Sequence, residues 1–434
     1  MNYLETVDYL FTRLPMYSRI GAAAYKEDLG NTIALCEILD NPELRFKSIH
    51  IAGTNGKGSV SHMLASVLQC AGYRTGLYTS PHLHDFRERI RVDGKEISED
   101  FIVDFVAHIQ PHIDKIDPSF FEITVAMAFD YFANQEVDIA VIETGLGGRL
   151  DSTNVITPEL SVITNIGFDH MHLLGDTLEK IATEKAGIIK KEVPVVVGEF
   201  REATGPLFVR KAREKRAPLS FADREKAATN WSFEGQNMTV EVTIRHTDIK
   251  DYYTLDLSGL YQMKNLLTVL QSVQVLKEKG WVIPEAALRE GLTRTKTLTG
   301  LHGRWEKLHE HPLVIADVAH NEDGILELVA QLEVTTFHQL HIVIGMVKDK
   351  DVRRILGFLP PDAHYYFTQA PIPRALPVED LWAAAEEAGL KGQSYPDVNT
   401  ALKEALGHAH KDDLVLVCGS VFVVGEIDRN RLGK

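Results

Sequence analysis

A glycine-rich segment at residues 48–59 has the residue types and spacing needed to bind the phosphates of a nucleotide. It reads Ser48-Ile-His-Ile-Ala-Gly-Thr-Asn-Gly-Lys-Gly-Ser59, an apolar run followed by glycines, a lysine and a hydroxyl. Glycines at 53, 56 and 58 let backbone N–H groups converge on phosphate oxygens, and Lys57 adds a positive charge for the β and γ phosphates. Ser59 offers a hydroxyl to Mg²⁺. The segment predicts a nucleotide loop, and the alternative is a glycine-rich turn with a surface lysine.

The spacing in this segment departs from the common G-x-x-x-x-G-K-[ST] motif. Residue 51 is isoleucine, and Gly58 separates Lys57 from Ser59. The order of strand, loop, lysine and hydroxyl is still the one that phosphate binding requires. The departure therefore weakens the motif match without removing the physical basis of the prediction.

A carboxylate at the end of a neighbouring strand is needed to hold the metal that accompanies nucleotide phosphates. Residues 138–143 form an apolar run that ends in Glu143, which makes this residue the first metal candidate. Residues 144–154 then form a glycine-rich loop at the end of that strand, where α/β folds place their ligands. A merely flexible loop is the alternative, because glycine by itself specifies only backbone freedom.

A third polar group follows the apolar run 160–166, where Asp169 and His170 stand just beyond the expected strand end. His170 is either a neutral imidazole ligand or a loop histidine paired with Asp169, and spacing alone favours the second interpretation. On the same grounds Lys185, in the segment Glu184-Lys-Ala-Gly187, fits an ordinary helix-surface lysine.

The composition excludes several classes of function. The chain has 434 residues and a formal net charge of −15, without a Lys/Arg block of the size that nucleic-acid backbones require, so we expect no nucleic-acid partner. Its richest basic stretch, Arg210–Arg216, is interrupted by Glu214 and fits a solvated helix face.

No membrane span is expected, and the first residues lack a signal pattern, which favours a cytoplasmic protein. Cys36, Cys70 and Cys418 lie in apolar stretches and are expected to be reduced thiols that act as small hydrophobic side chains.

Short runs rich in Val and Ile alternate with segments of helical periodicity, the order that a parallel α/β sheet with helices on both faces produces. The expected strands of the first series are 48–52, 75–78, 138–143, 160–166 and 193–197. Those of the second series are 313–318, 341–346, 365–369 and 414–418, with a helix at 322–332. The sequence thus predicts a mostly parallel sheet that contains the phosphate loop (P-loop), and a smaller α/β domain after it.

The two series define two expected domains, residues 1–296 and 297–434. A polar, weakly patterned segment at 293–303 has the character of a linker between them. Residues 230–256 alternate polar and apolar side chains, so they are expected as antiparallel strands at the edge of the first sheet.

Taken together, these segments resemble the folylpolyglutamate synthase/dihydrofolate synthase family, within the wider group of Mur-type ligases. The resemblance covers nearly the whole chain. It rests on residues 53–59, 79–83, 88–90, 121–124, 143–148, 151–154, 169–170, 184–187, 261–262, 265, 303–304, 317–321 and 419–420. The resemblance implies a P-loop ligase domain followed by a smaller Rossmann-like α/β domain that contacts glutamate and nucleotide.

The resemblance also implies roles for individual residues. Those implied in ATP binding are Gly53, Thr54, Asn55, Gly56, Lys57, Gly58, Ser59, Asn265, Arg304 and Asp317. Those implied in holding two Mg²⁺ ions are Ser59, Glu143, His170 and Lys185, the last as a carbamate. Those implied beside the folate or pteroate are Ser80, Pro81, His82 and Asp151. Lys57, Lys185 and His320 are implied in catalysis, with His320 near the incoming glutamate.

The activity that the resemblance implies is ATP-dependent addition of L-glutamate to a reduced folate, to dihydropteroate, or to both. A monomer is the default expectation. Phosphoryl transfer would turn the carboxylate into an acyl phosphate, which the glutamate amine then attacks. A ligase of cell-wall precursors is the alternative within this class. A regulatory NTP-binding switch is disfavoured by the lack of an Asn-Lys-x-Asp segment, and a dinucleotide oxidoreductase by the lack of G-x-G-x-x-G at the first helix.

Overall fold

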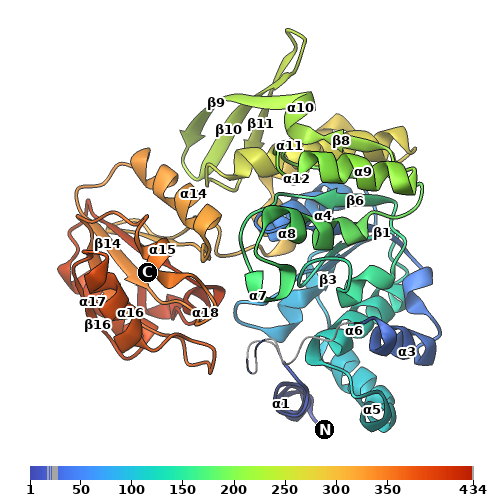
Figure 1. Ribbon diagram of the computed structural model, residues 1–434, viewed down its shortest axis with the longest axis horizontal. Helices are drawn as coiled ribbons and strands as arrows, with labels where there is room; N and C mark the ends of the chain where they lie inside the picture. Colours follow the sequence, from blue (N-terminus) through green and yellow to red (C-terminus); the bar gives the residue numbers. More distant parts are fainter. Residues whose placement is uncertain (17–18, 20, 22–27, 433–434) are drawn as a thin grey trace. The chain divides into compact units, whose positions relative to one another are not determined.

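The computed structural model describes residues 1–16, 19, 21 and 28–432, which form two compact units (Figure 1). Unit 1 comprises the described residues within Met1–Ile166, Met171–Asp256 and Gln262–Leu301. Unit 2 comprises those within Gly167–His170, Leu257–Tyr261 and His302–Lys434. Two short segments of unit 2 are therefore flanked in the chain by residues of unit 1.

Unit 1 is built on an eight-stranded sheet of order β4-β3-β2-β5-β1-β6-β7-β8. Its strands are β1 (Lys47–Ala52), β2 (Thr75–Tyr78), β3 (Ile90–Val92), β4 (Lys95–Glu96), β5 (Ile139–Glu143), β6 (Leu160–Ile163), β7 (Val195–Val197) and β8 (Leu219–Phe221). Strands β3 and β4 pair antiparallel at one edge, and the other pairs are parallel. The predicted mostly parallel sheet is confirmed, although the run 160–166 leaves the sheet after Ile163.

Helices cover both faces of this sheet. On one face, Tyr78, Ala140 and Ile142 join a hydrophobic core with α1 (Tyr3–Arg13), α3 (Gly30–Ile38), α5 (Glu99–Ile116) and α6 (Phe120–Asn134). Alternate strand residues point to the other face, where α4 (Lys57–Cys70) and α11 (Gln262–Glu278) pack. Shorter helices of unit 1 are α7 (Met171–Leu174), α8 (Leu178–Lys185), α9 (Gly205–Lys215), α10 (Ala222–Glu225) and α12 (Glu285–Thr293).

Residues 230–256 are in antiparallel strands, as predicted, but the prediction that they extend the first sheet was wrong. They lie in a separate antiparallel sheet formed by β9 (Lys226–Glu234), β10 (Asn237–Ile244) and β11 (Lys250–Leu255) (Figure 1). The alternating apolar residues Met238, Val240 and Val242 are buried, and the sheet packs against α11 and α12. Alternation predicts one buried face, but it does not identify the surface that buries it.

The segment expected as a linker, 293–303, contains a short helix, α13 (Thr295–Thr299). Its polar side chains bond within unit 1. Thr299 Oγ1 lies 2.8 Å from His62 Nδ1 of α4, and Thr295 Oγ1 donates to the Gly291 carbonyl at 3.0 Å. The segment appeared unpatterned in the sequence because its threonines satisfy local carbonyls instead of forming an apolar stripe.

Unit 2 is a second, smaller α/β fold, as predicted. Its six strands, in the order β12-β13-β17-β14-β15-β16, are β12 (Glu306–His309), β13 (Leu313–Ala316), β17 (Leu414–Cys418), β14 (Leu340–Ile344), β15 (His364–Phe367) and β16 (Gly392–Ser394). All pairs are parallel except β12–β13. The helices are α14 (Glu322–Glu333), α15 (Val352–Leu356), α16 (Val378–Glu387), α17 (Val398–His408) and α18 (Val421–Gly425). Among the described helices of both units, none is long and apolar enough to cross a bilayer.

The parallel strands bring the polar segments of unit 1 to one edge. Because β1, β2, β5 and β6 run in the same direction, their carboxyl ends meet at the same edge of the sheet. The glycine loop leaves β1, Ser80 follows β2, Glu143 ends β5 and Thr164 follows β6. The topology therefore positions these groups for a common site.

We predict that Gly291→Ala destabilises unit 1. A Cβ at Gly291 would lie 2.6 Å from the Val67 Cα, so α12 and α4 could not keep their present separation. We expect a loss of about 2–3 kcal/mol, as for overpacking of a dense core. Gly407→Ala is the control, because a Cβ there meets nothing within 4 Å. Calorimetric unfolding should show a lower transition temperature for Gly291→Ala alone, and an unchanged one would contradict this close approach.

Candidate active site

The glycine loop between β1 and α4 is held in shape by the segment that follows β6. The Thr54 N–H donates to the Asn165 carbonyl at 3.0 Å, and the Asn55 N–H donates to Asn165 Oδ1 at 2.8 Å. Thr164 Oγ1 donates back to the Asn55 carbonyl at 2.6 Å. A Cβ at Gly53 would lie 1.9 Å from Thr164 Oγ1, so glycine is required there. The loop is thus a fixed structure, as phosphate binding by backbone N–H groups needs.

The first turn of α11 contacts the same loop at two points. Gly56, with φ of +84°, precedes α4, and a Cβ there would lie 2.3 Å from Asn265 Oδ1. Asn265 Nδ2 donates to Gln262 Oε1 at 2.8 Å, and Gln262 Nε2 donates to Ser59 Oγ at 3.1 Å. Ser59 and Gln262 are fully buried. Gln262 therefore orients the hydroxyl that was predicted to face the metal, a role that no spacing in the sequence indicated.

Two lysine side chains converge on the carbonyl of Gly53. Lys57 Nζ donates to it at 3.1 Å and to the Thr54 carbonyl at 3.2 Å. Lys185 Nζ donates to the Gly53 carbonyl at 2.7 Å, and its residue is only 4% exposed. The interpretation of Lys185 as a helix-surface lysine was wrong, because the last turn of α8 lies against the loop. The two lysine amines therefore meet at one carbonyl of the loop.

Glu143 lies beside the start of the loop. It pairs with Ile51 in the register of β5 and β1, it is 4% exposed, and its Oε2 accepts from the Ser80 N–H at 3.3 Å. Pro81 follows Ser80 in the chain. Strand β5 lies between β2 and β1, so the carboxylate stands between the two segments that leave those strands.

The donor set at this edge fits a magnesium ion carried by a nucleotide. Ser59 supplies a hydroxyl and Glu143 a carboxylate, the oxygen donors that Mg²⁺ prefers. Nowhere in the described ranges do three or more His, Cys, Asp or Glu side chains gather to hold a metal by themselves. A nucleotide-bound Mg²⁺ needs only one or two protein ligands, since phosphates and water supply the others.

His82 lies in an aromatic surround next to the end of β2. Its Nδ1 accepts from Arg89 Nε at 2.8 Å, and its ring meets those of Phe11 and Phe86 edge-on at 6.0 and 6.3 Å between centroids. Burial and the neighbouring Arg89 charge lower the pKa of His82 to about 3, so the imidazole is neutral. Arg89, whose guanidinium lies 5.3 Å from the Phe120 ring centroid, was not predicted as a site residue.

Asp151 holds the glycine-rich loop that follows β5. Its Oδ2 accepts from the Leu146 N–H at 2.7 Å, and its Oδ1 accepts from the N–H and the hydroxyl of Thr153 at 3.0 and 2.5 Å. Burial raises the pKa of Asp151, and it outweighs these hydrogen bonds, which lower the pKa. A Cβ at Gly145 would lie 2.4 Å from Cζ of Phe121, a residue of α6. The loop is therefore closely packed, which argues against the alternative of a merely flexible loop.

In unit 2, Asp317 follows β13 and is almost completely buried. Its Oδ2 accepts from the Tyr261 hydroxyl at 2.7 Å and from the Trp305 N–H at 2.8 Å. Burial raises the pKa of Asp317, opposed by these bonds and by the charge of Arg304. Arg304 Nη1 donates to the Gly303 carbonyl at 3.2 Å. The two residues that the resemblance places at the nucleotide therefore interact electrostatically within unit 2.

A second group of polar side chains in unit 2 surrounds Asp169. Asn321 Nδ2 donates to Asp169 Oδ2 at 3.0 Å, His320 Nε2 lies 3.3 Å from the same oxygen, and Lys350 forms an ion pair with Oδ1. His170 Nε2 lies 3.8 Å from Oδ1. Burial raises the pKa of Asp169, but the charges and hydrogen bonds of these neighbours have the larger effect and hold the pKa well below its usual range. Asp169 therefore serves several partners, and not His170 alone.

His170 and Lys350 differ in how the sequence could have identified them. Burial lowers the pKa of His170 to about 3, so it is a neutral imidazole, which suits both of the interpretations left open. Lys350 was not predicted. The only available signal was its place in a polar segment shortly after β14, at the carboxyl end of a parallel strand.

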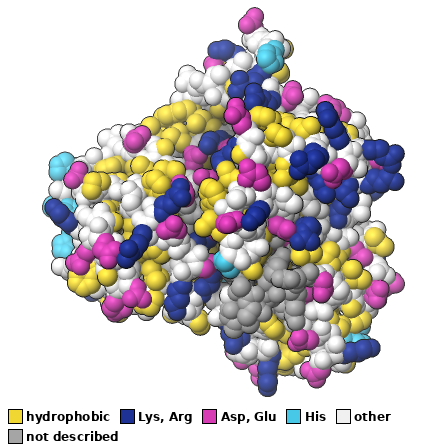
Figure 2. Space-filling model, in the orientation of Figure 1, with side chains coloured by type: hydrophobic (Ala, Val, Ile, Leu, Met, Phe, Trp, Pro, Cys, Tyr) yellow, Lys and Arg dark blue, Asp and Glu magenta, His cyan; other side chains and the backbone are white. Residues whose placement is uncertain are grey.

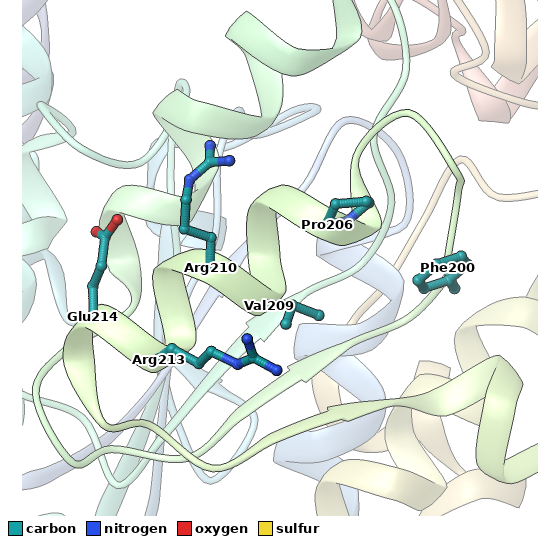
Figure 3. Close-up of a pocket in the computed structure, with 6 residues that line it drawn as sticks. All are labelled: Phe200, Pro206, Val209, Arg210, Arg213 and Glu214. Carbon is teal, nitrogen blue, oxygen red and sulfur yellow. The ribbon is translucent and has the colours of Figure 1, made fainter.

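A pocket of about 560 Å³ lies along α9. It is lined by Phe200, Pro206, Val209, Arg210, Arg213 and Glu214 (Figure 3). Lysine and arginine side chains gather over this part of the surface (Figure 2), and the helix ends with the exposed Arg216 paired to Glu192 at 2.6 Å. The predicted solvated helix face at 210–216 is confirmed, and none of the predicted site residues lines the pocket.

A fixed glycine loop at the carboxyl edge of a parallel sheet, followed by a second α/β unit, defines the Mur ligase class. Comparison with protein families agrees, because residues 51–273 match the Mur ligase middle domain and residues 303–421 match the Mur ligase, glutamate ligase domain. Among relatives, dihydrofolate synthase/folylpolyglutamate synthase of Bacillus subtilis is 36% identical over 419 residues, covering 94% of this chain and 95% of that protein. Folylpolyglutamate synthase of Lacticaseibacillus casei is 32% identical over 443 residues, covering 100% and 99%.

Solved structures give the same result. Escherichia coli FolC in complex with DHPP and ADP is 30% identical with a TM-score of 0.83, covering 98% of this chain and 96% of that one. Mycobacterium tuberculosis folylpolyglutamate synthase complexed with ADP is 31% identical with a TM-score of 0.88, covering 100% and 98%. The chain therefore belongs to the folylpolyglutamate synthase/dihydrofolate synthase family of Mur ligases.

We predict that Gly56→Ala impairs nucleotide binding. An added Cβ would collide with Asn265 Oδ1 and displace the loop from α11. We expect the affinity for ADP, measured by isothermal titration calorimetry, to fall about 10- to 100-fold. Gly72→Ala is the matched control, since Gly72 also has positive φ, at +90°, but open space around it. Gly72→Ala should lose about 1 kcal/mol of stability and bind ADP normally. Equal affinities of Gly56→Ala and wild type would contradict this role of the loop.

Proposed function

We propose that this protein is an ATP- and Mg²⁺-dependent ligase that joins L-glutamate to the carboxylate of a reduced folate, and of dihydropteroate. The observation that carries the proposal is the arrangement at the edge of the unit 1 sheet. There, a fixed glycine loop with Lys57 adjoins Glu143 at the end of the neighbouring strand β5. Relatives over the full chain are named for these two activities, and their solved structures hold ADP or DHPP.

The residues of unit 1 suit the first half of this reaction, transfer of the γ-phosphoryl group to a carboxylate. A carboxylate is a poor electrophile, and its charge repels the phosphate that it must attack. The loop N–H groups, the α4 N-terminus and Lys57 bind and neutralise phosphate oxygens, which lowers this repulsion and orients the γ phosphate. Ser59 and Glu143 would hold Mg²⁺, which supplies further neutralisation of those oxygens when bound.

The second half is attack of the glutamate amine on the acyl phosphate, followed by collapse of a tetrahedral intermediate to amide and phosphate. We assign Arg304 and Asp317 to the nucleotide and His320 to the region of the incoming glutamate. The hydrogen bonds of Asp317 to Tyr261 and of Asn321 to Asp169 support these assignments, because they fix the residues around them. The neutral His82 and the packed loop at 145–148 would lie beside the pteridine.

We further propose that Lys185 is carbamylated and, with His170, holds a second Mg²⁺. The buried amine already lies 2.7 Å from the Gly53 carbonyl, where a carbamate would place anionic oxygens near the phosphates. With ¹³C-labelled bicarbonate, the wild-type protein should show a carbamate resonance that Lys185→Arg lacks. Lys190→Arg, which removes another partly buried lysine, should keep it. A spectrum without that resonance in the wild type would refute the modification.

Phosphate release with ATP, Mg²⁺ and glutamate tests the main proposal. We expect release in the presence of dihydropteroate and of tetrahydrofolate, assayed in parallel. Lys57→Ala should lower release about 100- to 1,000-fold with either substrate, because a charge that faces the transferred group is lost. Lys180→Ala is the control, since Lys180 pairs with Asp176 on the exposed side of α8. Normal turnover by Lys57→Ala, or turnover only with a nucleotide-linked peptide, would overturn the proposal.

A further inference from the structure

A chain of buried hydrogen bonds connects β1 to the glycine-rich loop after β5. His50, in β1, is completely buried, and its Nε2 lies 2.8 Å from Thr153 Oγ1. That hydroxyl lies 2.5 Å from Asp151 Oδ1, whose carboxylate also binds the backbone of the loop. None of the roles assigned above uses His50 or Thr153. The connection nevertheless begins three residues before Gly53, in the strand that leads into the phosphate loop.

The direction of these hydrogen bonds follows from the chemistry of the groups. Both oxygens of Asp151 already accept backbone N–H groups, from Leu146 and Thr153, and such bonds favour the ionised carboxylate. An ionised carboxylate only accepts, so the Thr153 hydroxyl must donate to it. The Thr153 oxygen then accepts from His50, which makes His50 the Nε2–H tautomer. His50 therefore fixes the direction in which the Thr153 hydroxyl points.

The loop that Asp151 holds lies between α6 and α8. A Cβ at Gly145 would collide with Phe121 of α6, and one at Gly148 would lie 2.9 Å from the Lys185 carbonyl of α8. The backbone N–H of Arg149 donates to the Glu184 carbonyl at 2.8 Å. A small shift of Asp151 would therefore move backbone that is packed on both sides. In the proposed function, this loop lies beside the pteridine.

A role in core stability alone does not account well for His50. Its Nδ1 is buried, and no described residue gives it a hydrogen-bond partner, which is unfavourable for folding. The neighbouring strand residues Ile49 and Ile51 show that apolar side chains fill β1. An apolar residue at position 50 would avoid the unpaired nitrogen but would leave the Thr153 hydroxyl without its donor.

We propose that His50 is a positioning residue for the acceptor substrate: through Thr153 it fixes Asp151 and the loop backbone at 145–148, and so sets the affinity for dihydropteroate and folate. This inference rests on the proposed function. It predicts that His50 affects the KM for the acceptor and does not affect the KM for ATP.

The test compares variants of the two linking residues in the phosphate-release assay. His50→Leu and Thr153→Val should each raise the KM for the acceptor about fivefold to tenfold, the effect of one lost hydrogen bond. The KM for ATP and kcat should stay within about twofold. His50→Gln, whose amide can donate from nearly the same place, and Thr153→Ser should restore the acceptor KM. The double variant should be no worse than either single one, because both break the same connection.

His62→Leu provides the matched control. His62 and Thr299 are also buried in unit 1 and also form a 2.8 Å histidine–threonine contact, but this contact joins α4 to α13. This variant should lower the unfolding temperature and leave the acceptor KM unchanged. If His50→Leu behaves in the same way, or raises both KM values together, the proposal is overturned. Should His50→Leu fail to fold, Thr153→Val and the two conservative variants still decide it. Lack of wild-type turnover with either acceptor would instead refute the proposed function.

Discussion

The carbonyl of Gly53 is the point on which the geometry of the site depends. It accepts hydrogen bonds from two lysine side chains, one from the helix that follows the loop and one from the end of α8, 132 residues away in the chain. This carbonyl cannot turn without breaking both hydrogen bonds, so the neighbouring N–H groups keep their direction. Thr164 and Asn165 fix another part of the loop through their hydrogen bonds to the backbone of Asn55. Preorganisation of this kind allows phosphate oxygens to bind without first ordering the backbone.

Much of the fold could be predicted from the sequence, because local signals determined it. Runs of Val and Ile gave the parallel strands of both units, and the position of Glu143 at the end of such a run placed it beside the glycine loop. Lys185, Gln262 and Lys350 could not be predicted in the same way. Their importance comes from contacts with residues distant in sequence, such as the 203 residues between Gln262 and Ser59. The separate sheet at 226–255 escaped prediction because alternation of side chains says nothing about the partner surface.

Within each unit, buried polar groups have a definite charge state. Burial keeps His82 and His170 neutral, whereas Asp169 stays ionised because cationic and hydrogen-bonding neighbours outweigh the same effect. In the proposed function this separation is useful, since phosphate and carboxylate substrates would add several negative charges. The neutral imidazoles would then act as ligands or acceptors, while Lys57 and Arg304 would supply the opposing positive charge.

The division of the chain into units has a consequence for how the smaller fold could exist by itself. Asp317 accepts a hydrogen bond from Tyr261. Asp169 interacts with three residues of the smaller fold, namely Lys350, His320 and Asn321. Tyr261 and Asp169 both belong to short segments that precede His302 in the chain. A recombinant fragment starting at residue 302 would contain the whole six-stranded sheet, but the buried Asp317 would lose the Tyr261 hydroxyl and the buried Lys350 would lose its ion-pair partner Asp169. Such groups are costly to bury alone. Gene fusion or excision during evolution would therefore have had to carry residues 167–170 and 257–261 along with the sheet.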